Sequence, residues 1–337
     1  MLPFAIATLL PAGLLALACL FGGVWVWAGI AAITVVAFVA DKLPGPAPEA
    51  RTAGHRLSEV LGLVHFALLA LAVWAMGGPL PVVDKVLIVV GCGLYFGQVS
   101  NSNAHELIHR ADRWAFRLGA ANYVTVLFGH HTSAHRLVHH VHAATPRDPA
   151  TARLGEGFWA YLPRTWIGSF RAGLRAEQHR HGGVRWPTPY VAYVLGALAT
   201  VGIAALLGGG AGVLGLIGIA SYAQVQLMLS DYVQHYGLER AEQPDGRRAP
   251  MGPAHSWNAP QWYSSAMMLN APRHSAHHTR PAQPFPQLEL TPDTMPMLPH
   301  SLPVMAVVAL VPPVWKRMMR PRVAQWRASG DMTPATS

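Results

Sequence analysis

Cysteine and charge are both scarce in this chain. Two of its 337 residues are cysteines, Cys19 and Cys92, and both lie in apolar stretches. They cannot form a Cys-x-x-Cys pair, which excludes a zinc or redox site of that kind and a cysteine-ligated iron site. Charged residues make up 12% of the chain, against about a quarter in soluble domains. With 52% hydrophobic residues, the composition predicts an integral membrane protein.

Long apolar stretches are abundant instead. The chain begins Met1-Leu2-Pro3-Phe4, without the basic segment of a secretory signal, so we expect the first stretch to be a retained helix. Six stretches approach the roughly 20 helical residues that cross a bilayer, and short glycine- or proline-containing turns join them in pairs. The sequence predicts an all-α integral membrane fold with six transmembrane helices in three hairpins. They occupy residues 3–21, 24–41, 57–77, 82–102, 189–208 and 211–231.

Basic residues decide the predicted orientation. They are nearly absent within the hairpin turns, Lys85 being the exception, and frequent between Arg110 and Arg185 and in the C-terminal third. The positive-inside rule then places both termini in the cytoplasm of a bacterial inner membrane. Topology explains the net charge of +9, so we expect no nucleic-acid partner. We divide the chain into transmembrane regions at 1–104 and 189–231, and cytoplasmic catalytic segments at 105–188 and 232–337.

Nine histidines form four short clusters beyond the predicted ends of these helices. Histidines four residues apart share a helical face, and imidazole is the commonest protein metal ligand. A single ion rarely holds so many nitrogen ligands, so the set predicts two ions in a cytoplasmic histidine-rich module. The nine candidates are His105, His109, His135, His139, His140, His235, His274, His277 and His278.

Ligand type narrows the choice of metal. An all-nitrogen shell suits zinc, copper, nickel or iron. Zinc sites usually close at four ligands, so nine histidines favour a dinuclear redox site with positions open for oxygen, and iron as its metal. His130 and His131 precede the second cluster and are alternative ligands.

Carboxylates near the clusters are candidate partners for the second ring nitrogen of each ligand. An ordinary surface carboxylate is an equally good interpretation of every one of them. The candidates are Glu106, Asp148, Glu156, Asp231 and Glu239.

The clusters resemble the histidine boxes of the integral-membrane alkane hydroxylases, within the wider membrane fatty-acid desaturase and hydroxylase superfamily. Residues 105–110 are similar to the first box and 135–140 to the second, and 145–150 resembles the segment that follows it. Residues 231–238 look like the hydroxylase-specific box and 273–278 like the last. The resemblance runs from about residue 57 to 325 and implies that the nine histidines hold two iron ions, with no catalytic residue beyond the ligands.

An activity and partners follow from this resemblance. It implies a non-haem di-iron alkane 1-monooxygenase that inserts one atom of O2 into the terminal C–H bond of an alkane or related chain entering from the bilayer. Members commonly take electrons from rubredoxin, and this chain has no rubredoxin cysteines. A separate rubredoxin-type donor and its reductase are therefore implied, and the basic cytoplasmic face suits an acidic donor. Trp25 and Trp27 are candidate gates for substrate size, with interfacial anchoring the stronger interpretation.

Three positions depart from the family pattern. Asp231 stands where asparagine is common, Gln234 where glutamate is common, and Ala276 at a usually acidic place. They bear on the surroundings of the ligands and on substrate preference.

Three other functions compete with hydroxylation. A desaturase of the same superfamily usually needs a histidine at position 136, where this chain has Arg136. A zinc protease is suggested by His-Glu-x-x-His at 105–109, with Glu106 as general base, but leaves seven histidines without a role. A metal transporter would place its ligands within the spans near the midplane, whereas these lie beyond the span ends.

Overall fold

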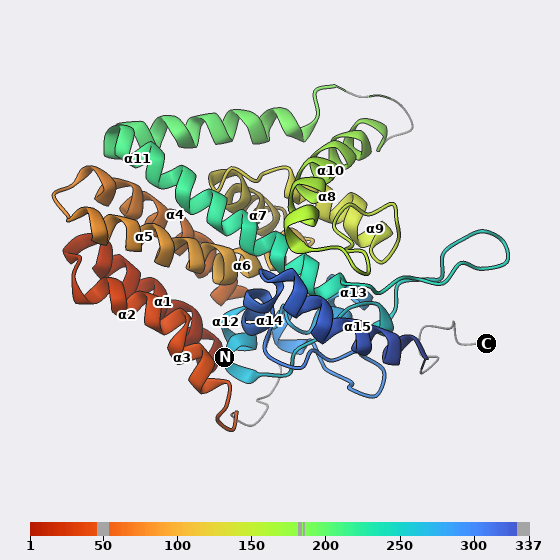
Figure 1. The fold of residues 1–337 in the computed structure, drawn as a ribbon. Coiled ribbons are helices and arrows are strands. Elements are labelled where there is room, and N and C mark those ends of the chain that lie inside the picture. Colours follow the sequence, from red (N-terminus) through yellow and green to blue (C-terminus); the bar gives the residue numbers. More distant parts are fainter. Residues whose placement is uncertain (46–53, 181–183, 185, 329–337) are drawn as a thin grey trace.

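The computed structural model describes residues 1–45, 54–180, 184 and 186–328. Within these ranges the chain is helical, as predicted, and its extended pairing is limited to two isolated bridges, Glu242 with Arg248 and Asn258 with Met297. Long helices lie side by side in one half of the molecule, and short helices and loops form the other half (Figure 1). A loop expected at 43–54 falls largely on residues outside the described ranges.

The N-terminal helices form a tight hairpin. Helix α1 (Leu2–Phe21) turns into α2 (Val24–Ile33), which α3 (Val35–Ala40) continues. Gly22 and Gly23 make the turn with φ of 62° and 57°, a left-handed conformation that residues with a Cβ rarely adopt. The backbone N–H of Gly23 donates to Asp84 Oδ2 at 2.8 Å, which fixes the turn against the next hairpin.

The second hairpin carries the chain into the polar half. Helix α4 (His55–Gly77) is followed by a helical run at Val82–Ile108, made of α5 (Val82–Tyr95), the π-helix η1 (Phe96–Ser100) and α6 (Asn101–Ile108). The apolar pattern predicts an end near residue 102. The helix instead continues for another turn and a half, because backbone hydrogen bonding does not stop where hydrophobicity does.

Helix α11 (Pro189–His235) is two antiparallel arms under one label. The chain reverses at Gly209, where φ is 60° and ψ is −152°, as the glycines at 208–210 predict. Near this bend Gly208 lies so close to Gly77 that a Cβ on Gly77 would come within 2.9 Å of the Gly208 Cα. Glycine at both positions therefore permits the backbone contact between α4 and α11.

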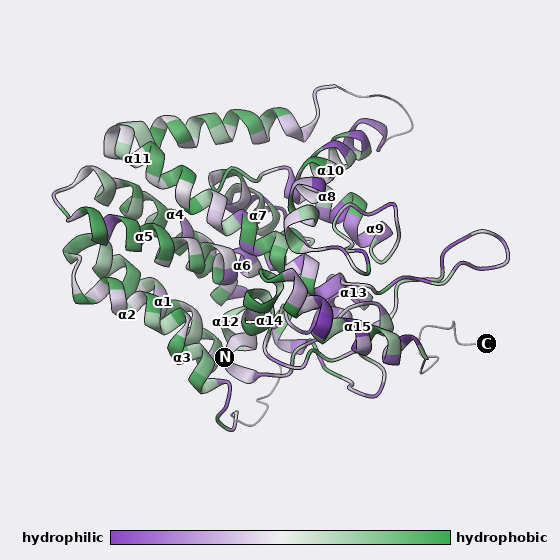
Figure 2. Ribbon diagram, viewed as in Figure 1, coloured by the Kyte–Doolittle hydropathy of each residue, from purple (hydrophilic) through white to green (hydrophobic). Residues whose placement is uncertain are grey.

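The long helices consist largely of hydrophobic residues, whereas hydrophilic residues are more frequent in the half with the short helices and loops (Figure 2). Trp27, Leu198 and Leu206 are 60%, 62% and 87% exposed, values that suit contact with lipid chains rather than water. Among the described residues, four helices are long and apolar enough to cross a membrane, and residues 24–40 add a shorter apolar helix. The chain is a multi-pass membrane protein.

Shorter elements surround the ends of the long helices. The C-terminal pair α14 (Leu302–Ala309) and α15 (Pro312–Ala328) packs near the end of α11, with the buried Trp315 against Tyr232 and Tyr236. The apolar stretch at 302–314 is too short to span a bilayer, which predicts that it lies at the membrane interface or packs on the catalytic segments. It packs near the end of α11. The remaining elements are α7 (Arg113–Thr125), α8 (His131–Ala134), η2 (His135–His139), α9 (His140–His142), α10 (Phe158–His179), η3 (Pro253–His255), α12 (Trp262–Met267), α13 (His274–Thr279) and η4 (Phe285–Gln287).

Candidate metal centre

The fold brings all nine predicted histidines together in two neighbouring groups. Within each group the donor nitrogens all lie within 4.8 Å of one another. The five-histidine group consists of His105, His109, His135, His140 and His277. The four-histidine group consists of His139, His235, His274 and His278.

Both histidines of the first cluster, His105 and His109, belong to the five-histidine group. His105 lies on α6 and His109 directly follows it, one helical turn further on. Their Nε2 atoms lie 2.8 Å and 3.1 Å from His135 Nε2. The predicted shared face of this pair is confirmed, and it exists because α6 runs past the apolar stretch.

The second cluster is divided by a π-helix. Its four-residue spacing predicts that His135 and His139 share a face. Their ring centroids lie 5.1 Å apart, but their donor nitrogens belong to different groups. The π-helix η2 covers His135–His139, and its wider turn brings residues five apart into register. His135 Nε2 therefore lies 2.9 Å from His140 Nε2, and His139 joins the other group.

The last cluster is divided in a similar way by the short helix α13. His274 and His278 are four apart and face the same way, with their Nε2 atoms 3.1 Å apart. His277 is offset by one position, and its Nε2 lies 3.1 Å from His140 Nε2. His235, at the end of α11, completes the four-histidine group with its Nε2 2.9 Å from His274 Nε2.

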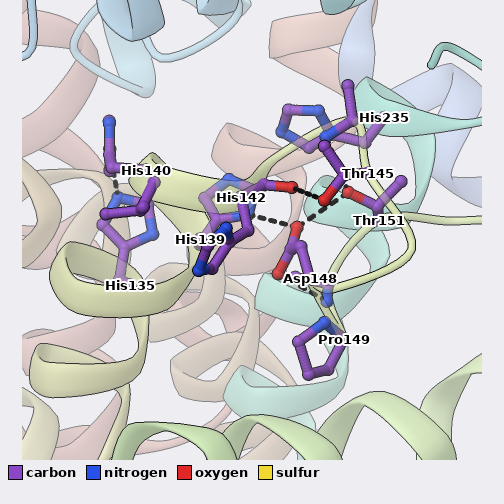
Figure 3. A network of polar contacts seen from close by, with 12 residues as sticks. His135, His139, His140, His142, Thr145, Asp148, Pro149, Thr151 and His235 are labelled. Carbon is purple, nitrogen blue, oxygen red and sulfur yellow. Dashed lines mark hydrogen bonds and ion pairs between the residues drawn. The ribbon is translucent and has the colours of Figure 1, made fainter. Parts of the chain in front are cut away.

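The two groups are direct neighbours because two chain segments contribute to both. The rings of His140 and His278 stack with centroids 4.6 Å apart, although each belongs to a different group. The rings of His135 and His139 lie 5.1 Å apart across the same boundary. In Figure 3 His135 and His140 lie together, whereas His139 lies beside Asp148.

Hydrogen bonding alone cannot account for the five-histidine group. His135 Nε2 lies 2.8–3.1 Å from three other ring nitrogens, those of His105, His109 and His140. A neutral ring nitrogen carries either one hydrogen or one lone pair, so it cannot pair with all three. Lone pairs converging on a cation are a consistent alternative. Two ligands at about 2.1 Å on opposite sides of an ion would be ~4.2 Å apart, so each donor set fits a metal ion.

A buried carboxylate holds one of the imidazoles. Asp148 Oδ2 lies 2.9 Å from His139 Nδ1 and accepts from Thr151 Oγ1 at 2.7 Å, while Asp148 Oδ1 accepts from the backbone N–H of Ala150 at 3.0 Å. Asp148 lies between His139 and Thr151 in Figure 3. The contact leaves His139 Nε2 directed towards the four-histidine group, which is the usual role of a carboxylate behind a metal-binding histidine.

Burial keeps most of these imidazoles neutral, the form that binds metal. Burial first, and then neighbouring imidazoles, lower the pKa of His140 and His277 well below the usual 6.5. His139 differs from them. Burial lowers its pKa, but the neighbouring Asp148 carboxylate has the larger combined effect, so the pKa of His139 is raised above 6.5. Burial raises the pKa of Asp148, yet the charge and hydrogen bond of His139 bring it down to about 2.

The other predicted carboxylate partners have different contacts. Glu106 lies 3.5 Å from Arg110, Glu156 lies 2.7 Å from Arg164, and Glu239 lies 3.9 Å from Arg327. The alternative ligands His130 and His131 belong to neither histidine group of the described chain. His131 instead lines cavities beside them.

Two narrow cavities border the metal centre. One reaches His135 and His139, the other reaches His135 and His274, and Leu227 and Asp231 line both. Asp231 is only 9% exposed. The sequence analysis did not identify Leu227 as a site residue. A signal was present, because 227, 231 and 235 follow one another at four-residue intervals and so share the face of α11 that carries His235.

Comparison with known proteins supports this geometry. A profile of the family described as "Fatty acid desaturase" matches residues 79–308, which include all nine histidines. The chain belongs to this family.

Curated relatives extend the match over most of the chain. Alkane 1-monooxygenase of Acinetobacter baylyi is 34% identical over 75% of this chain and 62% of its own length. Alkane 1-monooxygenase 1 of Alcanivorax borkumensis is 33% identical over 80% of this chain and 67% of its own length. The xylene/toluene monooxygenase hydroxylase component XylM of Pseudomonas putida is 28% identical over 91% of this chain and 85% of its own length. The chain thus aligns with about three-fifths of the Acinetobacter relative.

Proposed function

We propose that this fatty acid desaturase family member is a membrane non-haem di-iron monooxygenase that hydroxylates the terminal C–H bond of alkanes or related apolar chains. The observation that carries the proposal is the pair of adjacent all-nitrogen donor groups at the polar end of an apolar helix bundle. The relatives named as alkane 1-monooxygenases support the same reaction class.

In this proposal the nine histidines are the ligands of two iron ions, five for one ion and four for the other. The bound irons supply the activation of O2 and the transfer of one of its oxygen atoms to carbon. The protein supplies the positions of the ligands. Asp148 orients His139, and burial keeps most of the remaining imidazoles deprotonated and able to bind.

The surroundings of the centre suit an apolar substrate. Leu227, Met228 and Phe128 contribute apolar walls to the cavities beside the histidines. Such walls orient a hydrocarbon by shape and keep water away from the reacting carbon. A substrate dissolved in the bilayer would approach from the helix bundle, and protons and electrons from the polar side.

The proposal includes a topology. Residues 1–104 and 189–231 would supply six spans in three hairpins, and 105–188 and 232–337 the catalytic segments, with both termini in the cytoplasm of a bacterial inner membrane. This orientation follows from the basic residues outside the hairpin turns. It gives the metal centre access to a rubredoxin-type donor and its reductase, whose acidic surface the basic face would attract.

Metal analysis and product analysis test the proposal together. Purified protein reconstituted with ferrous salt should hold two irons per chain, and should convert octane, a longer alkane or xylene to an alcohol with O2, rubredoxin and reductase. Fewer than two irons per chain in folded protein would overturn the di-iron assignment. An alkene product would assign the chain to the desaturases, and peptide cleavage with one zinc per chain to the proteases.

A further inference from the structure

A third cavity lies on the apolar side of the metal centre. It is bounded by α4, η1, α6, α7 and α11, and reaches His65, Ser100, Asn101 and Asn122. It shares Asn101, Tyr123 and Leu227 with the cavity that reaches His105 and His274. Ser100 precedes His105 by five residues, or about 7.5 Å along a helix axis. The two cavities therefore adjoin, and a substrate that widens them on binding would have one end at each.

The accessible lining of this distal cavity is mostly apolar, but several of its residues carry polar groups. Half of its twelve lining residues carry a polar side-chain group, and Phe96, Val126 and Leu227 are among the apolar remainder. Asn122 is only 1% exposed. Its Nδ2 donates to the carbonyl of Gly62 at 3.1 Å, whereas its Oδ1 is buried without a partner among the described residues. The residue with this unpartnered acceptor thus lines the cavity.

His65 adds a second acceptor through Ser100. We take the one hydrogen of Thr125 Oγ1 to be donated to the carbonyl of Ala121 or Asn122, each 3.1 Å away, because these can only accept. It must then accept from His65 Nε2 at 2.8 Å, which leaves His65 Nδ1 as an acceptor. Ser100 Oγ, 2.5 Å from Nδ1, therefore donates its hydrogen to His65. Its lone pairs remain free to accept.

From these contacts we infer that the distal cavity binds a hydroxyl group of the substrate, at the end remote from the carbon that is oxidised. Asn122 Oδ1 and Ser100 Oγ are acceptors without a donor, so they complement an O–H and offer nothing to a methyl group. A site built to accept a hydrogen bond discriminates against an analogue that lacks the donor. The preferred substrate class is then an apolar chain or ring that already carries one hydroxyl, rather than a plain hydrocarbon.

The inference rests on the proposed hydroxylation and makes its outcome more specific. The terminal methyl group and O2, with two electrons from the carrier protein and two protons, give a terminal CH2–OH and water. One C–H bond is broken, one C–O bond forms, and the O–O bond is cleaved. With the existing hydroxyl held in the distal cavity, the product is a diol with a hydroxyl at each end. Entry in the opposite direction would instead oxidise the carbinol carbon to an aldehyde.

Paired substrates provide the test. Octane and primary octanol, and p-xylene and its mono-alcohol, are supplied to the iron-loaded enzyme, and products are identified by mass spectrometry. We expect the alcohols to be used with a kcat/KM about 5- to 10-fold above that of the matched hydrocarbons, the magnitude of one net hydrogen bond, and to give mainly diols. Aldehyde as the main product, or equal use of the two substrates, would overturn the inference.

Two asparagines make a matched pair of variants. Asn122→Leu removes one of the two free acceptors from the cavity, and should lower the ratio of alcohol to hydrocarbon kcat/KM by about 2-fold or more. Asn103→Leu is the control, because Asn103 is equally buried, donates to the carbonyl of Ser58 at 2.9 Å and has an unpartnered Oδ1, but lines none of the three cavities. Its substrate ratio should match that of the unsubstituted chain. Equal changes in both variants would assign the effect to helix packing and overturn the inference.

Binding to metal-free protein separates this inference from the proposed function. Octanol should raise the Tm of the unsubstituted metal-free chain more than octane does, and Asn122→Leu should reduce the difference. Oxidation of octane without alcohol preference, and without this Tm difference, leaves the monooxygenase proposal standing and removes the hydroxyl site. If no substrate is oxidised but the Tm difference is clear, the hydroxyl site stands and the monooxygenase proposal is removed.

Discussion

The two histidine groups are built from the same segments of chain but lie in different surroundings. All members of the four-histidine group are buried, whereas His105, His109 and His140 of the five-histidine group are half-buried. The buried group has a carboxylate partner, Asp148, and the other has the positive charge of Arg136 near His109. The buried group thus has fewer donor nitrogens and a more constrained environment. Substitution of one of its histidines should therefore cost more iron and more activity.

Removal of one ligand from each group gives the strongest test of this difference. His235→Ala leaves three imidazoles in the buried group and should reduce hydroxylation by more than about 100-fold, since loss of a ligand's outer partner already costs about 10- to 100-fold. Iron content should fall by about one ion per chain. His109→Ala leaves four imidazoles, the number that the buried group has throughout, and should retain more iron and more activity.

Both variants need a check on folding. Membrane insertion and the Tm of the metal-free protein should stay close to those of the unsubstituted chain. If the His109 and His235 variants lose iron and activity equally, donor number and burial do not distinguish the groups. Full activity of the His235 variant would remove that residue from the proposed ligands.

Asp148→Asn tests the carboxylate that only the buried group has. The amide keeps the shape, but its one oxygen replaces only one of the two carboxylate oxygens, so it can accept either from Ala150 or from Thr151 and His139. It also removes the charge next to His139. We expect metal affinity or activity to fall by about 10- to 100-fold. Iron titration would show the loss in one of two sites. A uniform loss across both sites would contradict a role specific to His139.

The sequence predicted which histidines come together but not how they are divided. Four-residue spacing placed His105 with His109 correctly, because α6 is a regular α-helix. It gave no indication that His139 belongs to a different group from His135, because no residue in the segment signals that η2 would adopt a π-helix. The sequence also could not show that Asp148, rather than Glu156, contacts His139. A loop connects Asp148 to His139, so no helical repeat predicts the contact. Composition and periodicity predict helices, whereas contacts between loops depend on tertiary packing.

Acid should destabilise the metal-free protein through imidazoles of both groups, since the pKa values of His274 and His278 in the four-histidine group are also well below the usual 6.5. Burial and neighbouring imidazoles lower the pKa of His109, His135, His140 and His277. The unfolded chain binds more protons at these positions below pH 6.5, so the free energy of unfolding should fall between pH 7 and 5, by about 1.4 kcal/mol per pH unit for each proton.

The contribution of His139 to the free energy of unfolding should have the opposite pH dependence. Its raised pKa gives a contribution that is complete below the unfolded value of 6.5 and is lost as the pH rises through the folded value. His139→Gln should therefore make the metal-free protein more sensitive to acid, and His277→Gln less sensitive. Thermal unfolding from pH 5 to 8 measures both. Parallel pH profiles for the two variants would contradict the assigned directions.

The smallest effect is expected from Glu156→Gln, the counterpart of Asp148→Asn in a more exposed place. Glu156 accepts from Arg164 Nε at 2.7 Å, and the side chain of Arg164 is 26% exposed. The glutamine can still accept from the guanidinium, and partly exposed ion pairs contribute about 1 kcal/mol or less. Iron content and hydroxylation should therefore stay within about 2-fold of the unsubstituted chain. A loss of iron or activity as large as that of Asp148→Asn would mean that any carboxylate after the second histidine cluster serves the metal centre. The contact of Asp148 with His139 would then not distinguish the buried group.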